Sequence, residues 1–396
     1  MGCAGTRVVA VTDLAIGDPA RRDRQVPVVL DGITDTGTGN IIGPADAAAR
    51  LDRTRIVFVG EEHTNPGSHE AQRQLIAALI ARGRQVLVGL EMYPYTTQDA
   101  LDDWVAGLVD EPAFLRASHW YKHWGYSWDL YRDIFLLAQE QRVLMFAVNT
   151  PRDVVAAVRK KGLANLTADE AAHIPPIVDT KSTDHRRLFR AFFEEGDKIH
   201  SGLSVDAWEN MFQAQCTWDA TMAKNAVESL KAHGGENAIM VVLIGGGHVA
   251  YGMGIQRQAA LWFDGVTTTV ATVPVASNEA PTRVRASYAD FLWGVPARDE
   301  PARPTLAAVG VSVRDDAKTP HPVLTSVEGK SAAELGGART GDQILSLDGA
   351  PVPDKEGFLL LLNDRHWGDV VHVDVQRQGQ RLTLSVPLRR LSPPGP

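Results

Sequence analysis

The chain has 396 residues, of which 44% are apolar, and it carries a formal net charge of −8. This length exceeds one ordinary domain, so we expect two domains with substantial cores. The acidic balance, without a tract of clustered Lys and Arg, argues against nucleic acid as a partner. No stretch approaches the roughly 20 uninterrupted apolar residues that a membrane-spanning helix needs.

Only two cysteines are present, Cys3 and Cys216, which excludes a disulfide framework, a zinc-cysteine site and a c-type haem motif. A bacterial lipoprotein is cleaved just before a cysteine that follows a small residue, as in Gly2-Cys3. Residues 1–24 are therefore predicted to be a tether that has lost its apolar signal segment, with lipid on Cys3 and a periplasmic or cell-envelope location. The alternative is a cysteine that stands there by chance.

Four apolar runs predict buried parallel strands, because none of them alternates between apolar and polar residues. They are residues 55–59, 86–90, 143–148 and 239–244. Helical patterns lie before and between them, at 44–51, 68–83, 96–108 and 126–142. This alternation predicts an α/β fold with a mostly parallel central sheet flanked by helices. The helical stretch from about 151 to 233 is expected to form a lid over the sheet edge.

Polar residues follow these runs, at the edge of an open α/β sheet where ligands bind. The pattern Gly-x-x-His occurs twice there, ending at His63 and at His248, and Glu91 ends the second run. We expect these three residues to converge in one polar site. They would bind a divalent metal, or act with Glu61 as acids and bases without one. The alternative is that the histidines only hydrogen-bond a crowded loop edge.

Further polar residues are candidates for the same site. Asn149 and Arg152 follow the third run, and Tyr251 lies just after His248. Gln215 and Asp219 interrupt an apolar helical stripe. Because a buried carboxylate is costly without a partner, Asp219 is expected to meet a cation, a donor or the polar site, or else to make an ordinary helix-packing hydrogen bond.

The segment 119–131 is unusually rich in Trp, Tyr and His. Such a stretch can form a wall for a flat apolar ligand, with a His or Tyr as axial ligand to iron. The alternative is core packing with hydrogen-bonded polar tips.

Beyond a segment rich in Pro, Ala and Arg at 276–304, the pattern changes to short strands. Val371 to Val375 alternates with period two and turns through Gln378-Gly379, which predicts a hairpin. A second, small β-rich domain is therefore expected.

Residues 25–295 resemble the ChaN-like haem-binding lipoprotein family, within a wider group that includes Tiki, TraB and erythromycin-esterase-like proteins. The resemblance is carried in order by Val57 to Pro66, Leu90 to Met92, Trp128 to Tyr131, Ala147 to Arg152, Ala214 to Ala223 and Gly245 to Val249. It implies an α/β fold, haem as cofactor, a part in iron uptake, and in some members haem held at a homodimer interface. The cofactor-binding candidates are His63, Asn149, Arg152, Gln215, Asp219, His248 and Tyr251.

The wider group keeps a second function open. In that alternative the chain is a metal-dependent hydrolase of Tiki or esterase type that uses His63, Glu91 and His248.

Residues 305–390, between a linker at 296–304 and a tail at 391–396, resemble a bacterial PDZ domain of the kind attached to periplasmic proteases. Ala308-Val309-Gly310-Val311 matches the carboxylate-binding loop, and Ser331 to Leu345 matches the core motif that follows. The resemblance implies that a peptide or protein carboxyl terminus adds as a strand beside Val311 to Val313, with Val309, Gly310, Val311 and Val313 as binding residues. The alternative is a PDZ fold that serves only as a spacer or brace.

Overall fold

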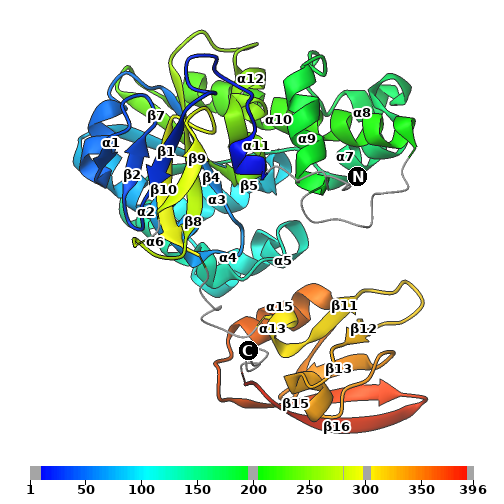
Figure 1. Cartoon of the computed structure of the whole chain (residues 1–396). Helices are drawn as coiled ribbons and strands as arrows, with labels where there is room; N and C mark the ends of the chain where they lie inside the picture. The colour runs from blue at the N-terminus through cyan, green and yellow to red at the C-terminus, as the bar shows by residue number, and fades with distance from the viewer. Residues whose placement is uncertain (1–9, 195–203, 280, 298–304, 390–396) are drawn as a thin grey trace, which may run out of the picture. The chain divides into compact units, whose positions relative to one another are not determined.

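The computed structural model describes residues 10–194, 204–279, 281–297 and 305–389 (Figure 1). The predicted lipid-carrying Cys3 and the tail 391–396 lie outside these residues. The chain forms two compact units, one of residues 1–110 and 133–299 and the other of residues 111–132 and 300–396. Of the helices that the structure describes, none is both long and apolar enough to cross a membrane.

The first unit is built on an eight-stranded sheet with the order β3-β2-β10-β8-β4-β7-β5-β6. From β10 to β6 neighbouring strands run parallel, whereas β2 and β3 add antiparallel at one edge. The strands are β2 (Ile33–Asp35), β3 (Ile41–Ile42), β4 (Ile56–Glu61), β5 (Gln85–Pro94), β6 (Leu144–Asn149), β7 (Ala238–Gly245), β8 (Thr267–Val275) and β10 (Phe291–Pro296). The predicted mostly parallel sheet is confirmed.

A separate antiparallel pair, β1 (Gln25–Val28) and β9 (Thr282–Arg285), belongs to the same unit. Before β1, a short 3-10 turn at Val11–Asp13 begins a segment in which Leu14 and Ile16 are buried. These residues pack in one apolar cluster with Val26, Val28 and Tyr251. Residues 10–16 therefore contribute to the core of the unit.

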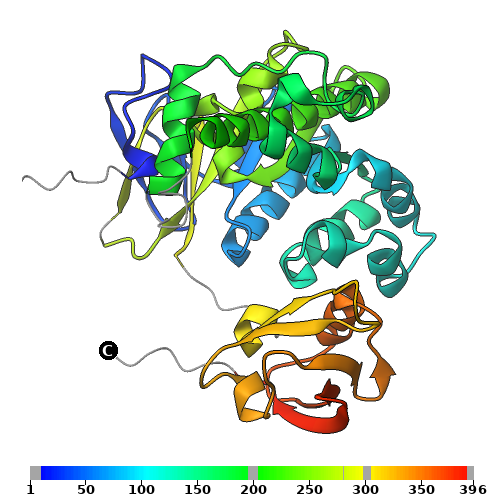
Figure 2. The same cartoon turned by 90° about the vertical axis from the view of Figure 1, so that its right-hand side faces the viewer.

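The helices of the first unit cover both faces of the sheet (Figures 1 and 2). They are α1 (Pro44–Arg50), α2 (Pro66–Ala81), α3 (Gln98–Ala106), α6 (Arg132–Glu140), α7 (Arg152–Lys161), α8 (Ala168–Ala171), α9 (Thr183–Glu194), α10 (Val205–His233), α11 (Gly246–Val249) and α12 (Ile255–Ala259). On one face, α10 packs Met222 and Ala226 against Phe58 and Val242. Since α2 contacts β4 and β5 from the other face, the central strands are covered on both sides, which explains their lack of alternation.

The predicted helix at 126–142 is shorter in the structure, because α6 begins only at Arg132. The preceding residues form α4 (Glu111–Ala117), α5 (Trp120–His123) and a 3-10 turn at Trp128–Leu130, and these elements belong to the second unit. From Asp133 onwards, α6 belongs to the first unit. Trp120 lies with its ring 5.0 Å from that of Trp128 and 5.2 Å from that of Tyr131. All three side chains are fully buried, so this aromatic segment packs as a core and does not form an open wall.

The second unit contains the antiparallel β-rich domain, with the strand order β11-β12-β13-β15-β16 and β14 paired with β13. Its elements are α13 (Leu306–Val309), β11 (Val311–Arg314), β12 (Val323–Val327), α14 (Ala332–Leu335), β13 (Gln343–Leu347), β14 (Ala350–Pro351), α15 (Lys355–Asn363), β15 (Val370–Arg377) and β16 (Gln380–Pro387). Gln378 and Gly379 both have positive φ, as a two-residue hairpin turn requires, so the predicted hairpin is confirmed.

Gly294 in β10 should be intolerant of a side chain. A Cβ there would lie 1.9 Å from the carbonyl oxygen of Val29. The backbone around Val29 cannot easily move away, because the Gly294 N–H donates to the carbonyl oxygen of Gly32 nearby. We expect Gly294→Ala to lower the free energy of unfolding by about 3 kcal/mol. Gly43→Ala is the control, because nothing lies within 4 Å of its Cβ position, and it should cost less than about 1 kcal/mol. Equal costs in urea titrations of the two variants would contradict the packing argument.

Candidate functional site

Glu61, the last residue of β4, is the buried anchor of the first Gly-x-x-His loop. Its Oε1 lies 2.8 Å from His63 Nδ1, while its Oε2 accepts an N–H from Gln72 at 2.8 Å and lies 3.3 Å from His69 Nδ1. Burial by itself would raise the pKa of Glu61, but His69 and His63 hold that pKa well below its usual range. The carboxylate is therefore ionised and orients the ring of His63.

Glu91 joins three neighbouring strands at the carboxyl edge of the sheet. The Gly245 N–H at the end of β7 donates to Glu91 Oε2 at 2.5 Å, and Asn149 at the end of β6 donates its side-chain N–H to the Glu91 carbonyl at 2.7 Å. Glu91 Oε1 lies 3.2 Å from His248 Nε2. The glutamate of β5 is thus fixed by both strands beside it.

His248 lies between two carboxylates. Besides Glu91 on its Nε2 side, Asp219 Oδ1 lies 2.6 Å from Nδ1, and the side-chain nitrogen of Gln215 is 2.9 Å from the same Nδ1. Burial lowers the pKa of His248, but Glu91 and Asp219 outweigh this and raise it to about 10. At neutral pH His248 is an imidazolium that donates from both ring nitrogens.

Gly245 brings the two loops together. A Cβ at Gly245 would lie 2.9 Å from His63 Cε1 and 3.6 Å from Glu91 Oε2, so the ring of His63 lies against the bare glycine beside Glu91. Burial lowers the pKa of His63, whereas Glu61 and Glu91 raise it, and the net shift is upward. The structure therefore brings His63, Glu91 and His248 together, as the repeated motif predicts.

Behind Asp219 lie two residues, His185 and Arg257, that the sequence analysis does not include among its candidates. Asp219 is fully buried, and its Oδ2 lies 3.9 Å from His185 Nε2. Arg257 donates to His185 Nδ1 at 3.1 Å and also pairs with Asp179. Burial lowers the pKa of His185 to about 4, so this ring is neutral and directs its Nε2 hydrogen towards Asp219.

His69 and Gln72 were also not predicted. They lie three residues apart on the buried face of α2, and both contact Glu61. Polar residues at helical spacing on an apolar face are a sequence signal, the same one that identifies Gln215 and Asp219. His185 carries the same signal, since it lies on the apolar face of α9 with Leu188 and Phe189, whereas Arg257 has none.

Two of the predicted cofactor-binding residues lie apart from this cluster. Tyr251 is buried, and its hydroxyl donates to Val11 O at 2.7 Å and accepts from Leu14 N–H at 2.9 Å, so this group is used in the core and does not face the site. Arg152 is exposed at the first position of α7. Asn149, by contrast, lies in the cluster, because its side-chain N–H donates to the backbone carbonyl of Glu91.

Within the described ranges no group of three His, Cys, Asp or Glu side chains is arranged to hold a metal ion, and the metal site of His63, Glu91 and His248 stays a prediction. Both ring nitrogens of His248 lie next to carboxylates, Nε2 at 3.2 Å from Glu91 and Nδ1 at 2.6 Å from Asp219. The three residues form a network of hydrogen bonds and ion pairs.

Aromatic side chains border the glycine-rich loop. Phe192 of α9 is 39% exposed, and its ring would lie 3.7 Å from a Cβ placed on Gly247. On another side, the ring of Trp218 meets His248 edge-on at 6.3 Å between centroids. Helices α9 and α10 of the predicted lid therefore supply apolar surface to this site.

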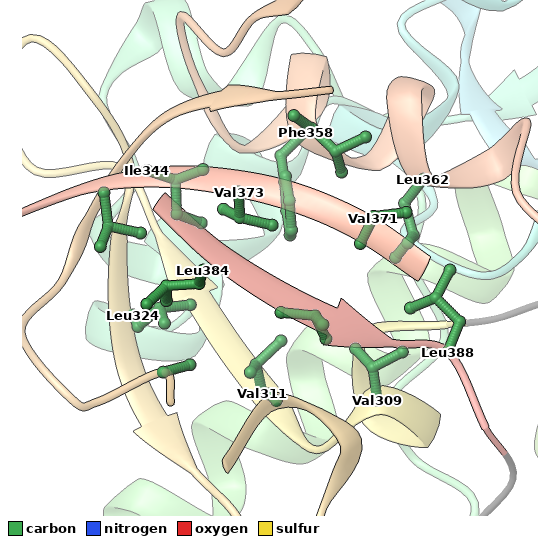
Figure 3. A pocket seen from close by; sticks show the side chains of 15 residues that line it. Val309, Val311, Leu324, Ile344, Phe358, Leu362, Val371, Val373, Leu384 and Leu388 are labelled. Atoms are coloured by element: carbon green, nitrogen blue, oxygen red, sulfur yellow. The ribbon is translucent and has the colours of Figure 1, made fainter. Parts of the chain in front are cut away.

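In the second unit, an apolar pocket of about 40 Å³ lies within the core, and its lining comes from β11, β12, β13, β15, β16 and α15 among other elements (Figure 3). The predicted peptide-binding residues Val309 and Val311 line it together with Phe358 and Leu362. Val313 is buried in the same core without lining the pocket.

Gly310 shapes the turn that leads into β11. Its φ of +80° is one that side chains rarely adopt, and a Cβ there would lie 2.1 Å from Ser331 Cβ. Only glycine fits this position.

His248→Gln should lower the free energy of unfolding, because it removes the positive charge that neutralises the carboxylates of Glu91 and Asp219. In the folded protein the pKa of His248 is raised to about 10 from its ordinary value of 6.5, so the stabilisation is complete below pH 6.5 and disappears as the pH rises through 10. We expect a loss of roughly 3–5 kcal/mol near pH 6 that narrows towards pH 10. Urea titrations across this range measure it. His366→Gln is the control, with a side chain that is 68% exposed, and a pH-independent loss in His248→Gln would refute the ion-pair account.

Family models match two separate parts of the chain. Residues 47–258 match the family model for haem-binding uptake, Tiki superfamily, ChaN, and residues 307–388 match the PDZ domain model. The solved structure of cofacial haem binding to ChaN of Campylobacter jejuni superposes with a TM-score of 0.50 and 18% identity, covering 66% of this chain and 95% of that chain. At this identity the likeness shows a shared fold.

Two curated proteins are similar to parts of the chain. RETICULATA-RELATED 5, a chloroplastic protein of Arabidopsis thaliana, is 24% identical over 261 residues, which is 63% of this chain and 35% of the relative. The regulator of sigma-E protease RseP of Escherichia coli (strain K12) is 35% identical over 66 residues, 17% of this chain and 14% of the relative. The chain thus spans well under half of either relative. From the family match over its α/β core, the chain belongs to the ChaN family of haem-binding uptake proteins in the Tiki superfamily, and it carries a PDZ domain.

Proposed function

We propose that the chain binds haem through its ChaN-like domain, for iron or haem uptake, and binds a peptide or protein carboxyl terminus through its PDZ domain. The observation that carries the haem proposal is family membership over residues 47–258. The geometry around His63 supports it.

His63 fits the role of an axial ligand. Its side chain is 28% exposed, and its Nδ1 is bound to the ionised Glu61 at 2.8 Å. A metal-ligating histidine commonly donates its other N–H to a carboxylate, which fixes the tautomer and makes the ligand more basic. In the neutral ring this arrangement leaves the lone pair on Nε2. His248 does not fit this role, since it is charged and bound on both sides.

The surface beside His63 suits a flat apolar group. The consecutive glycines 245–247 present backbone without side chains, and the exposed ring of Phe192 lies next to Gly247. When bound, haem supplies an iron centre that a single protein ligand can hold. The residues of this chain would position it and exclude water from its faces.

Location and assembly belong to the same proposal. A periplasmic or cell-envelope lipoprotein with lipid on Cys3, and a homodimer, are what the family resemblance supports. Because Cys3 lies outside the described residues, its lipidation stays a prediction.

A hemin titration followed by absorbance tests the haem proposal. We expect a saturable, stoichiometric Soret shift with the full chain. His63→Ala should weaken it about tenfold or more, since even the loss of a group behind a ligand costs about tenfold to a hundredfold in metal affinity.

The matched control is His366→Ala, a change at an exposed histidine of the second unit, which should bind as the unchanged protein does. Absence of a saturable shift would remove the haem proposal. Equal binding by His63→Ala would remove His63 as the ligand.

A second candidate function, hydrolysis, is favoured by one observation. His63 on Glu61, and His248 between Glu91 and Asp219, form histidine-carboxylate pairs of the kind that general acid-base catalysis uses. The comparisons give this function no support.

If the chain is a hydrolase, His63→Ala and His248→Ala should each abolish turnover of a chromogenic ester while far-UV circular dichroism stays native. Metal content, measured in the same samples by elemental analysis, distinguishes a metal-dependent reaction from one without metal. Turnover that survives both changes would exclude this site as its source.

A further inference from the structure

We propose that residues 111–132 are a docking segment for the PDZ domain of the same chain, in which α5 binds the outer face of α15. This outer face is formed by Glu356, Leu359, Leu360 and Asn363, which follow one another at helical spacing. The inference goes beyond haem and peptide binding, because it gives the PDZ domain a second partner within the chain itself.

Helix α15 is apolar on two sides, although only one side faces the core of its own domain. Phe358, Leu361 and Leu362 pack in that core. Leu359 is only 7% exposed, yet it does not belong to the core cluster, and Leu360 is half-buried. A helix that is apolar all round is a buried helix, so the outer face of α15 requires a cover.

Two polar contacts identify α5 and the residue before it as that cover. The hydroxyl of Tyr121 donates to Asn363 Oδ1 at 2.7 Å, and both residues are 7% exposed. Two helical turns earlier, Glu356 Oε2 lies 3.0 Å from His119 Nδ1. The contacts hold the two ends of the outer face, with the leucines between them. Because buried polar groups need their partners, the Tyr121 contact favours one docking geometry.

The docking segment has a core of its own. The ring of Trp120 lies 5.0 Å from that of Trp128 and 5.2 Å from that of Tyr131. One carboxylate ties the two ends of the segment together, because Glu111 accepts an N–H from Trp128 at 3.0 Å and another from Arg132 at 2.8 Å. Helix α5 is thus presented to α15 on a compact, ordered support.

Docking gives the PDZ domain a second connection to the rest of the chain. The first is the linker at 296–304. The second runs through the docking segment, which is inserted between α3 and α6 of the ChaN-like sequence. A protein bound to the PDZ domain would therefore be held at this insertion and not on a single tether.

Cross-linking of the full chain tests the docking. Cys3→Ser provides the background, because the other cysteine, Cys216, is buried. His119→Cys and Glu356→Cys are introduced together and treated with a short bismaleimide, and mass spectrometry identifies the product. We expect a link between these two positions within one chain. The control replaces Glu356→Cys by Arg381→Cys on β16, where the arginine is 68% exposed, and its link should form at least about tenfold more slowly.

Changes on each side of the contact should slow the link. Leu359→Glu would bury a carboxylate under α5, so the rate should fall about tenfold or more. Its matched control is Leu335→Glu in α14, where the leucine is 57% exposed, and this variant should link at the original rate. Tyr121→Phe leaves the PDZ domain unchanged but removes the donor to Asn363, so the rate should fall roughly fivefold.

Circular dichroism melting verifies that the variants are folded, and if Leu359→Glu is not, Tyr121→Phe decides. The docking is wrong if the link forms no faster than in the Arg381→Cys control. It is also wrong if the folded Leu359→Glu variant, or Tyr121→Phe, links at the original rate. A product that joins two chains would assign the contact to a second copy and overturn docking within one chain.

Discussion

The hydrogen bond from the Gly245 amide to Glu91 is the contact on which the rest of the site depends. It joins β7 to β5 at the point where both strands leave the sheet, and it holds the carboxylate where His248 can reach it. Because Gly245 has no Cβ, the ring of His63 from β4 lies against the same spot. The carboxyl ends of β4, β5 and β7 and the loops that follow them thus bring His63, Glu91 and His248 into a single polar cluster.

Burial explains why this cluster has so many members. Glu61 and Asp219 are fully buried, and a buried carboxylate is stable only when it is paired and hydrogen-bonded. Glu61 therefore meets His63, His69 and Gln72, while Asp219 meets His248 and, at a longer distance, His185. The result is a site whose histidines are held in position before any ligand arrives. The two histidines differ in their chemistry: His63 is half-buried with one nitrogen bound to a carboxylate, whereas His248 is enclosed and charged. This difference is what favours His63 over His248 as a ligand.

The two units would recognise their ligands by different means. In the ChaN-like domain the proposed haem site combines a histidine, bare glycine backbone and an exposed phenylalanine, so its recognition is by metal ligation and flat apolar contact. In the PDZ domain the proposed peptide end would meet an edge strand and a loop whose glycine has positive φ, so its recognition would rest on backbone contacts. A protein with both properties would carry haem to, or receive it from, a partner whose carboxyl terminus it binds.

The sequence by itself determined the parallel sheet and the meeting of His63, Glu91 and His248, because strands buried on both faces leave unbroken apolar runs and their carboxyl ends lie at one edge. It also identified Gln215 and Asp219, since helical spacing places them on one face. It could not show that Asp219 and Glu91 lie next to the two ring nitrogens of His248, or that Tyr251 turns into a core formed with residues 11–16. The contacts of His185 with Asp219 and Arg257 likewise became visible only in three dimensions. These contacts join segments many residues apart, and their distances are decided by how α9, α10 and α12 pack, which no local pattern of residues encodes.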